Sequence, residues 1–430
     1  MTRVVLPATA IAGHIGLPGD KSITHRALLI AAASEGETRI RGFGRSRDTE
    51  ATLAAVRALG VEVDEPGADE LVVHGVGLRG LEVPEGPVDC GNSGTLLRLL
   101  MGLLAGHGGC FELTGDASLC ARPMERVAEP LRAMGASVET TAGGAPVVIE
   151  GGALRGIQYE LPVPSAQVKS ALLLAGLSAA GSTSVVEPLV TRDHTELLLR
   201  AAGARVVRRG RRITVQPVTK LGLRGVDIPG DLSSAAPFIA AASLLAGSEL
   251  TLHDVGLNST RSGFVDVLAR MGGRVTVLHR RRAGAEPLGD LDVRSSELVA
   301  ARVDRAELPR LVDELPLLAL VAGMARGTTT IRGADELRVK ETDRVETVTD
   351  ALRPLGVHIE ALEDGFRIRG VPTRPRGGTV VHTQGDHRIA MLGAVAGLVS
   401  REGVRIEGDE AAASSFPGFF DLVDAVAKRA

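Results

Sequence analysis

Residues 238–255 and 264–275 read FIAAASLLAGSELTLHDV and FVDVLARMGGRV, and the order of patterns within them predicts the fold. The first stretch opens with a helix that is apolar almost all round, which predicts burial on every side. A short turn follows, and then an alternating run typical of a half-buried strand. The second stretch is an amphipathic helix closed by Gly272, which suits a left-handed cap before the next strand. These patterns predict a layered α/β unit with a buried inner helix and a sheet outside it.

The same order of patterns recurs six times along the 430 residues. The glycine that closes the amphipathic helix is present in the first five copies, as Gly60, Gly135, Gly203, Gly272 and Gly356. We therefore expect six α/β units built to one plan.

Two similar segments divide the repeats, LPGDKS at 17–22 and IPGDLSS at 228–234. Pro-Gly-Asp is typical of a turn. Three repeat units lie between the segments, and three follow the second one. We expect two similar domains, one spanning 20–229 and the other spanning 1–19 plus 230–430. Clefts between domains commonly bind ligands, so we expect the site in the interdomain cleft.

Composition excludes several classes of function. A net charge of −3 and an aromatic content of 2% argue against a nucleic-acid partner. No stretch reaches about 18 uninterrupted apolar residues, and the first twenty residues lack a signal-peptide core, so we expect no membrane partner. Three cysteines without CxxC spacing argue against a metal site or a disulfide framework. They fit the reducing cytoplasm, where we expect the protein.

The start of the first inner helix, PGDKSITHRAL at 18–28, carries Lys21 and Arg26. Cations are unfavourable at a helix N-terminus unless an anion lies there, so these residues predict an anion site. Ser22 is expected to cap the helix. The second inner helix follows the turn CGNSG at 90–94, which can present backbone N–H groups to a phosphate or a carboxylate.

Other inner helices also begin with polar or charged side chains, namely Ser165, Gln167, Lys169, Asp313, Glu314, Asp386, His387 and Arg388. Chance surface charge does not explain this shared location. If the inner helices are parallel, their positive ends converge on the cleft and form a strong trap for a multiply anionic ligand.

The stretch RVKETDR at 338–344 places three cations close together. Lys340 and Arg344 are four residues apart and would repel each other on one helix, which suggests an anion above them. Glu341 can pair with Arg344, and a carboxylate so placed can move protons. The alternative is a solvent-facing helix laced with charges, which is common.

These motifs resemble those of the enolpyruvyl transferases. The matching stretches, in family order, include PGDKSITHRAL, GNSGTLLRLL, GDASLCARPM, PSAQVKSALLLAGL, RDHTE, DELPLLA, ELRVKETDR, GDHRIAM and SFPGFF. The resemblance implies two domains, each made of three βαβαββ repeats in an inside-out α/β barrel. The chain is most similar to members that transfer the enolpyruvyl group of phosphoenolpyruvate to the 5-hydroxyl of shikimate 3-phosphate. That reaction releases phosphate and belongs to the shikimate pathway of aromatic amino acid biosynthesis.

The resemblance also implies site residues. Those expected to bind shikimate 3-phosphate are Lys21, Ser22, Arg26, Ser165, Ala166 (through its backbone), Gln167, Arg192, Asp313 and Lys340. Those expected to bind phosphoenolpyruvate are Lys21, Asn92, Gly94, Arg122, Gln167, Arg344 and Arg388. Asp313 would accept the proton of the attacking hydroxyl, and Glu341 and Lys21 are the candidates for protonating the methylene carbon. No metal or organic cofactor is implied, and the family's usual form is a monomer.

The sequence departs from the family pattern at three positions. Ser414 stands where some members carry a basic residue, Ala166 stands where some relatives have a second serine, and Glu336 stands where some relatives have Asn. One phosphate contact and one hydroxyl contact are therefore missing or supplied elsewhere.

Two alternative functions require residues different from those found here. Enolpyruvyl transferases that act on UDP-N-acetylglucosamine carry a mobile-loop cysteine five residues before the loop arginine, where this chain has Ala117. Cys120 lies only two residues before Arg122, so it matches that position poorly. A non-catalytic anion-binding protein would keep the arginines but would not need Asp313 and Glu341.

Overall fold

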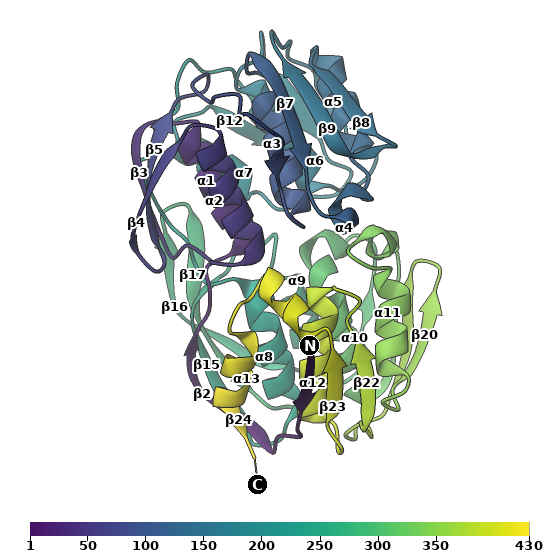
Figure 1. Cartoon of the computed structure of the whole chain (residues 1–430). Helices are drawn as coiled ribbons and strands as arrows, with labels where there is room; N and C mark the ends of the chain where they lie inside the picture. The colour runs from purple at the N-terminus through teal and green to yellow at the C-terminus, as the bar shows by residue number, and fades with distance from the viewer. Residues whose placement is uncertain (430) are drawn as a thin grey trace. The chain divides into compact units, whose positions relative to one another are not determined.

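The computed structural model describes residues 1–429 and divides the chain into two compact units (Figure 1). Unit 1 consists of Met1–Pro18, Pro229–Arg282 and Pro287–Ala430, and unit 2 consists of Gly19–Ile228 and Ala283–Glu286. Within the described residues, no helix is long and apolar enough to cross a membrane.

Unit 2 is built on three apolar helices, α1 (Lys21–Ala32), α3 (Gly94–Leu104) and α6 (Ala166–Gly176), and α3 packs against both of the others. Their companions are α2 (Arg47–Ala58), α4 (Ala117–Cys120), α5 (Glu125–Met134) and α7 (His194–Ala201).

Unit 2 also contains three mixed sheets of four strands each. The first is β14 (Gly225–Asp227), β3 (Glu35–Arg41), β5 (Glu70–Val76) and β4 (Glu62–Gly67). The second is β6 (Val88–Asp89), β7 (Gly109–Thr114), β9 (Gly144–Gly151) and β8 (Ser137–Thr141). The third is β10 (Gln158–Glu160), β11 (Thr183–Val186), β13 (Arg212–Val215) and β12 (Val206–Arg209).

All three sheets of unit 2 share one pairing scheme. In each, the first pair of strands is parallel and the next two pairs are antiparallel. The strand β14 comes last in the unit but pairs with β3, the first. Together with the pairs β6–β7 and β10–β11, this pair therefore joins the three sheets' repeats in a closed ring.

Unit 1 repeats the plan with the apolar helices α8 (Leu232–Leu244), α10 (Leu315–Met324) and α12 (His387–Val399), which pack against one another. Its companion helices are α9 (Gly263–Arg270), α11 (Arg344–Leu352), α13 (Phe419–Val426) and the 3₁₀ turns η1 (Leu308–Arg310), η2 (Val312–Glu314), η3 (Asp335–Val339) and η4 (Asp409–Ser414). One sheet is β16 (Arg274–Ala283), β17 (Glu286–Arg294), β15 (Glu249–Gly256), β2 (Ala10–Gly16) and β24 (Ala427–Lys428). Another is β18 (Arg302–Val303), β19 (Gly327–Ile331), β21 (Gly365–Gly370) and β20 (His358–Leu362). The last is β1 (Thr2–Val5), β23 (Val404–Glu407) and β22 (Thr379–His382).

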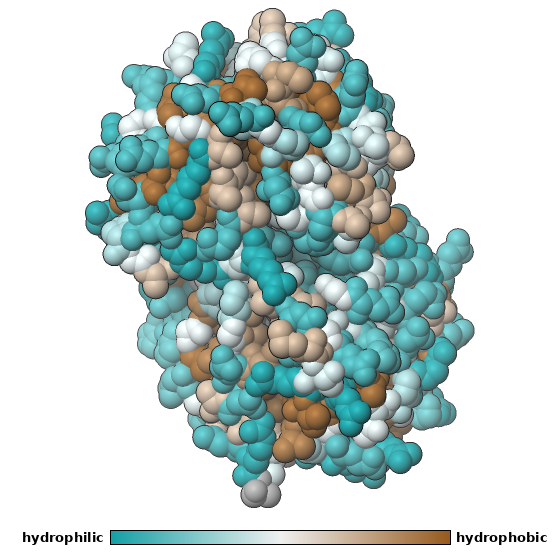
Figure 2. All heavy atoms as spheres, viewed as in Figure 1, coloured by the Kyte–Doolittle hydropathy of each residue, from teal (hydrophilic) through white to brown (hydrophobic). Residues whose placement is uncertain are grey.

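Each unit has its own hydrophobic core, and the apolar helices form the centre of it. All thirteen residues of α12 are buried, and in α1 every residue from Ile23 to Ala32 is buried. The prediction that the inner helices, which are apolar almost all round, are buried on every side is confirmed. On the face of the protein shown in Figure 2, by contrast, hydrophilic side chains cover most of the surface and hydrophobic ones are scattered.

The glycines that end the amphipathic helices have left-handed backbone conformations. The φ angles are 84° at Gly60, 109° at Gly135, 90° at Gly203, 94° at Gly272 and 93° at Gly356. Glycine adopts this region without a steric penalty, whereas other residues do so rarely. The cap predicted from the sequence is confirmed at all five positions.

The chain passes between the units at both Pro-Gly-Asp segments, as it does again on either side of Ala283–Glu286, and the aspartates of these segments cap helices. The Asp20 carboxylate accepts a backbone hydrogen bond at the start of α1, and Asp231 does the same for α8. The prediction that Ser22 caps α1 is therefore wrong. Gly19 is required for packing, because a Cβ there would lie 1.8 Å from the carbonyl oxygen of Gly42.

Candidate active site

The N-terminal ends of α1, α3 and α6 lie together in unit 2. The Gln167 amide donates to Thr95 Oγ1 at 2.9 Å, which joins the start of α6 to that of α3. Arg192, just before α7, donates from Nη1 to Ser22 Oγ at 3.4 Å, which joins it to the start of α1. We call the expected site residues of this unit the unit 2 cluster: Lys21, Ser22, Arg26, Asn92, Gly94, Arg122, Ser165, Ala166, Gln167 and Arg192.

Two cations of α1 are held by partners from other elements. The Lys21 ammonium lies 2.7 Å from Asp48 Oδ2, on α2. Arg26 is 3% exposed and donates from Nε to Thr195 Oγ1 at 2.7 Å and from Nη2 to Ser170 Oγ at 3.1 Å. These contacts hold both cations in place before any ligand binds. Sequence reasoning did not single out Asp48, which lies 27 positions from its partner.

Two guanidinium groups lie close to the turn before α3. Ser93 caps the helix, and Arg122 Nη2 donates to Asn92 Oδ1 at 2.6 Å. A Cβ on Gly94 would lie 2.9 Å from Arg98 Nη1 and 3.4 Å from Arg122 Nη1. Two guanidinium groups therefore approach the same helix N-terminus, an arrangement that attracts a phosphate or a carboxylate.

Arg98 was not among the predicted site residues. It is 4% exposed and donates from Nη1 to Gln167 Oε1 at 2.7 Å, so it orients the amide of a predicted ligand residue. The signal in the sequence was a single charged side chain within an otherwise apolar helix. Ser165 caps α6, and the first backbone N–H groups of that helix, including that of Ala166, have no carbonyl partner within the helix.

His25 connects these helix starts as a neutral side chain. Its ring lies 2.6 Å from Thr52 Oγ1 and 3.4 Å from Ser93 Oγ. Burial lowers the pKa of His25 well below its ordinary value, and the positive charges of Lys21 and Arg26 lower it further. The imidazole therefore adds no charge to the cluster.

In unit 1, the starts of α8, α10, α11 and α12 also carry charged side chains. Arg344 is 1% exposed and lies 2.8 Å from Asp386 and 2.6 Å from Glu341. Burial opposes its charge, but the two carboxylates outweigh this effect and raise the pKa of Arg344. We call the expected site residues here the unit 1 cluster: Asp313, Lys340, Glu341, Arg344 and Arg388.

Asp313 lies among three cations. Its carboxylate oxygens are 3.6 Å from Lys340 Nζ, 3.6 Å from Arg344 Nη1 and 3.7 Å from Arg261 Nη1. Its side chain is 16% exposed, so it is both sheltered and accessible. A carboxylate at this position can accept a proton while the cations around it bind an anionic ligand.

Arg261 is a second residue that sequence reasoning missed. It is 5% exposed and donates from Nη2 to Ser233 Oγ at 2.6 Å, at the start of α8. Ser233 in turn donates to Glu314, which lies 3.6 Å from Arg388 Nη1. The loop before α9 thus ties the starts of α8, α10 and α12 together.

Two expectations about lysines are corrected by the structure. Lys340 follows η3, and α11 begins only at Arg344, so the two do not repel each other as neighbours on one helix. Both instead face Asp313. Lys169, expected with the anion-binding residues of α6, is fully buried and paired with Glu187 at 3.0 Å and Glu196 at 2.8 Å.

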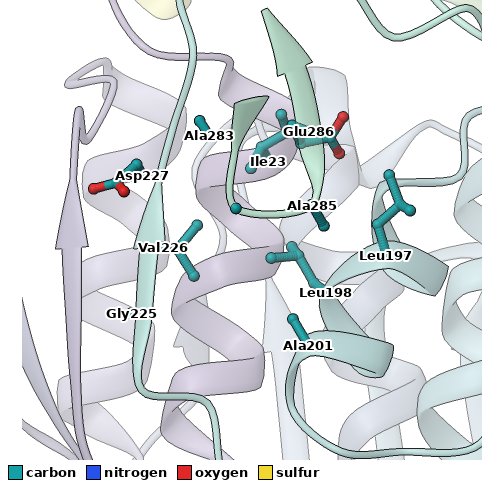
Figure 3. Close-up of a pocket in the computed structure, with 11 residues that line it drawn as sticks. Ile23, Leu197, Leu198, Ala201, Gly225, Val226, Asp227, Ala283, Ala285 and Glu286 are labelled. Carbon is teal, nitrogen blue, oxygen red and sulfur yellow. The ribbon is translucent and has the colours of Figure 1, made fainter. Parts of the chain in front are cut away.

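Unit 2 also contains a cavity of about 40 Å³ beside α1 and α7 (Figure 3). Ile23, Leu197, Leu198, Val226 and Ala285 are among its lining residues. No member of the unit 2 cluster lines it, so it is not the candidate substrate site. Among the described residues, no group of three or more His, Cys, Asp or Glu side chains is arranged to hold a metal ion.

Comparison with known proteins identifies the family. The family model for EPSP synthase (3-phosphoshikimate 1-carboxyvinyltransferase) matches residues 5–423. The chain belongs to the EPSP synthase family. A 3-phosphoshikimate 1-carboxyvinyltransferase of Alkalilimnicola ehrlichii is 50% identical over 420 residues, which are 97% of this chain and 94% of that protein. The enzyme of the same name from Pelobacter propionicus is 47% identical over 422 residues, 98% of this chain and 97% of that one.

Solved structures agree with this assignment. An EPSP synthase from Acinetobacter baumannii is 42% identical, with a TM-score of 0.88 over 99% of this chain and 98% of that chain. The enolpyruvyl transferase NikO from Streptomyces tendae is 21% identical, with a TM-score of 0.81 over 98% and 96% of the two chains, and it supports the fold alone.

The resemblance to enolpyruvyl transferases drawn from the motifs is confirmed, and so is the activity. As an EPSP synthase, the chain is a 3-phosphoshikimate 1-carboxyvinyltransferase of the shikimate pathway. The mixed α/β architecture with small mixed sheets is confirmed too.

Proposed function

We propose that the unit 2 cluster and the unit 1 cluster serve one reaction, in which the 5-hydroxyl of shikimate 3-phosphate attacks C2 of phosphoenolpyruvate. The observation that carries this proposal is Asp313, a carboxylate surrounded by Lys340, Arg344 and Arg261. A purely anion-binding protein needs the cations, but it does not need an accessible carboxylate at the point where three of them meet, because that negative charge repels an anion.

In the first step, Asp313 accepts the proton of the 5-hydroxyl as its oxygen bonds to C2. Glu341 or Lys21 delivers a proton to C3, which becomes a methyl group. The product is a tetrahedral ketal that carries both substrates. In the second step, the side chain that delivered the proton to C3 takes one back from the methyl group, and the bond between C2 and the phosphate oxygen breaks. Phosphate departs with the proton that Asp313 accepted, and the enolpyruvyl ether remains.

We propose that shikimate 3-phosphate is bound by Lys21, Ser22, Arg26, Ser165, the backbone of Ala166, Gln167, Arg192, Asp313 and Lys340. Two features support this. The helix starts of unit 2 lie together, and their first backbone N–H groups can bind a phosphate. The cations are also oriented in advance by side chains such as Asp48 and Thr195, which lowers the entropy cost of binding.

We propose that phosphoenolpyruvate is bound by Lys21, Asn92, Gly94, Arg122, Gln167, Arg344 and Arg388. The approach of two guanidinium groups to Gly94 supports this for unit 2. In unit 1, Arg388 supports it because its Nε is buried and has no hydrogen-bond partner among the described residues. A buried donor of this kind is costly unless a ligand satisfies it.

The organisation of the chain is part of the proposal. We propose two domains, 20–229 and 1–19 plus 230–430, each formed by three βαβαββ repeats in an inside-out α/β barrel, and a monomeric enzyme. The element order β6-α3-β7-α4-α5-β8-β9, in which α4 is a single turn before α5, and its counterparts support the repeat.

The experiment is phosphate release by the purified protein with phosphoenolpyruvate and either shikimate 3-phosphate or UDP-N-acetylglucosamine, without added metal. Release only with shikimate 3-phosphate supports the proposal. Release only with the nucleotide sugar would contradict the assignment of the acceptor, and release with neither would contradict the proposed roles altogether.

A further inference from the structure

The segment Thr191–Glu196, which reads TRDHTE, contacts several parts of unit 2. Arg192 reaches Ser22 on α1, and Thr195 Oγ1 accepts a hydrogen bond from Arg26. Glu196 pairs with Lys169 on α6. The position of this segment therefore determines how the proposed ligand residues of α1 and of the loop lie relative to one another.

Lys169 contacts this segment through its buried ammonium group. Its side chain is 0% exposed, and its ammonium donates to the backbone carbonyl of Arg192 at 2.8 Å. The same ammonium lies 3.0 Å from Glu187 and 2.8 Å from Glu196. Lys169 also lies one helical turn after Ser165, the cap of α6. One buried group thus links the start of α6 to the backbone that carries Arg192.

The charges around Lys169 balance. Arg208 Nη2 lies 3.0 Å from Glu187 and 3.1 Å from Glu196, so two cations face two carboxylates. Glu187 also accepts hydrogen bonds from the backbone and the hydroxyl of Thr191. Glu187 lies just after β11 and Glu196 lies in the first turn of α7. Both ends of the loop between these elements therefore belong to one cluster of four charges, Lys169, Arg208, Glu187 and Glu196.

Stability alone is a weak reason for this arrangement. Apolar side chains of similar volume often stabilise a protein as well as a buried ion pair does, because burial costs charges their hydration. A buried ionic cluster does, however, impose one geometry, since each charge has to meet its partners. Here that geometry includes a backbone carbonyl of the loop.

We propose that Lys169 is a positioning residue for shikimate 3-phosphate. It sets the backbone of Arg192 relative to Ser165 and Ala166 at the start of α6, and so aligns two sets of groups that bind this substrate. The side chain of Gln167, which is assigned to both substrates, is held instead by Thr95 and Arg98. The inference rests on the proposed function, because it takes Arg192 and the start of α6 as ligands of shikimate 3-phosphate. Lys169 itself does not touch the substrate.

The test uses the charge-balanced variant K169M/E196Q, in which Glu187 and Arg208 still form a pair. Calorimetry measures the dissociation constant of shikimate 3-phosphate, and steady-state kinetics measures the KM for phosphoenolpyruvate and kcat. We expect the dissociation constant to rise by about tenfold or more, the effect of losing a charge-assisted hydrogen bond, and the KM for phosphoenolpyruvate to change by less than about twofold. Ile149→Ala, in a buried position of β9, is the control for lost stability and should leave both constants unchanged.

A double-mutant cycle with Arg192→Ala separates positioning from general loosening. If Lys169 acts through Arg192, K169M/E196Q weakens binding by less than about twofold in the Arg192→Ala background. A tenfold loss in both backgrounds, or equal changes for both substrates, would overturn the inference while leaving the proposed function standing. A wild-type protein that does not bind shikimate 3-phosphate would overturn the proposed function first and the inference with it.

Discussion

Asp313→Asn keeps the shape of the side chain but removes its charge and its ability to accept a proton. General base catalysis contributes roughly 10²- to 10⁴-fold, so we expect kcat to fall by that factor, or about 3–5 kcal/mol in the barrier. The carboxylate lies 3.6–3.7 Å from Lys340, Arg344 and Arg261. Removing its negative charge leaves those cations freer to attract an anionic ligand, so the dissociation constant of shikimate 3-phosphate should stay within about threefold of wild type or fall.

The assay combines rapid-quench measurement of phosphate release with calorimetry on the same preparation. A loss that appears in kcat and not in binding identifies an interaction made only in the transition state. The reasoning is refuted if kcat falls less than tenfold, or if kcat and affinity fall by the same factor. Asp350→Asn is the matched control, because it makes the same exchange at an exposed position of α11 that lies outside the unit 1 cluster, and it should behave like wild type.

Three further predictions concern unit 2. Gly94→Ala should raise the KM for phosphoenolpyruvate by about tenfold, with little effect on shikimate 3-phosphate binding. The new Cβ would lie 2.9 Å from Arg98 Nη1 and 3.4 Å from Arg122 Nη1, so it would displace these guanidinium groups. Equal effects on both substrates would contradict this prediction. His25→Gln should flatten the loss of thermal stability between pH 7 and pH 5. The pKa of His25 lies well below its ordinary 6.5, so below that pH the unfolded chain binds a proton that the folded one does not, and stability falls with pH by up to about 1.4 kcal/mol per unit. Melting curves at both pH values check this, and an unchanged slope would count against it. Cys120→Ala should keep its activity within about twofold. The thiol donates to a backbone carbonyl at 3.4 Å, and it does not occupy the cysteine position of the enzymes that act on UDP-N-acetylglucosamine. An inactive variant would make UDP-N-acetylglucosamine a candidate acceptor again.

The fold was predictable because it rests on patterns that lie close together in the sequence. An inner helix such as α12 is apolar over its whole length, so its burial could be predicted without knowing its neighbours. Glycines such as Gly135 end helices by their own backbone conformation. The cap of α1 was mispredicted because Ser22 and Asp20 are both good capping residues, and only the geometry decides between them.

The site was less predictable where it depends on contacts between distant positions. Asp48 meets Lys21 from α2, and Arg261 meets Asp313 across 52 positions, a separation that no local pattern reveals. Lys169 looked like a ligand residue because it shares a helix start with Gln167. It turns inward instead, since Glu187 and Glu196 compensate its charge within the core.

The measurement that tests the central claim most directly is a single-turnover experiment with enzyme in excess, labelled phosphoenolpyruvate and shikimate 3-phosphate, stopped by rapid quench. If the two clusters serve one addition–elimination reaction, a species that carries both substrates and still holds its phosphate forms and decays before free phosphate accumulates, and Asp313→Asn does not form it. Phosphate that appears with no such species, or only together with a covalent adduct of the protein, would contradict the account.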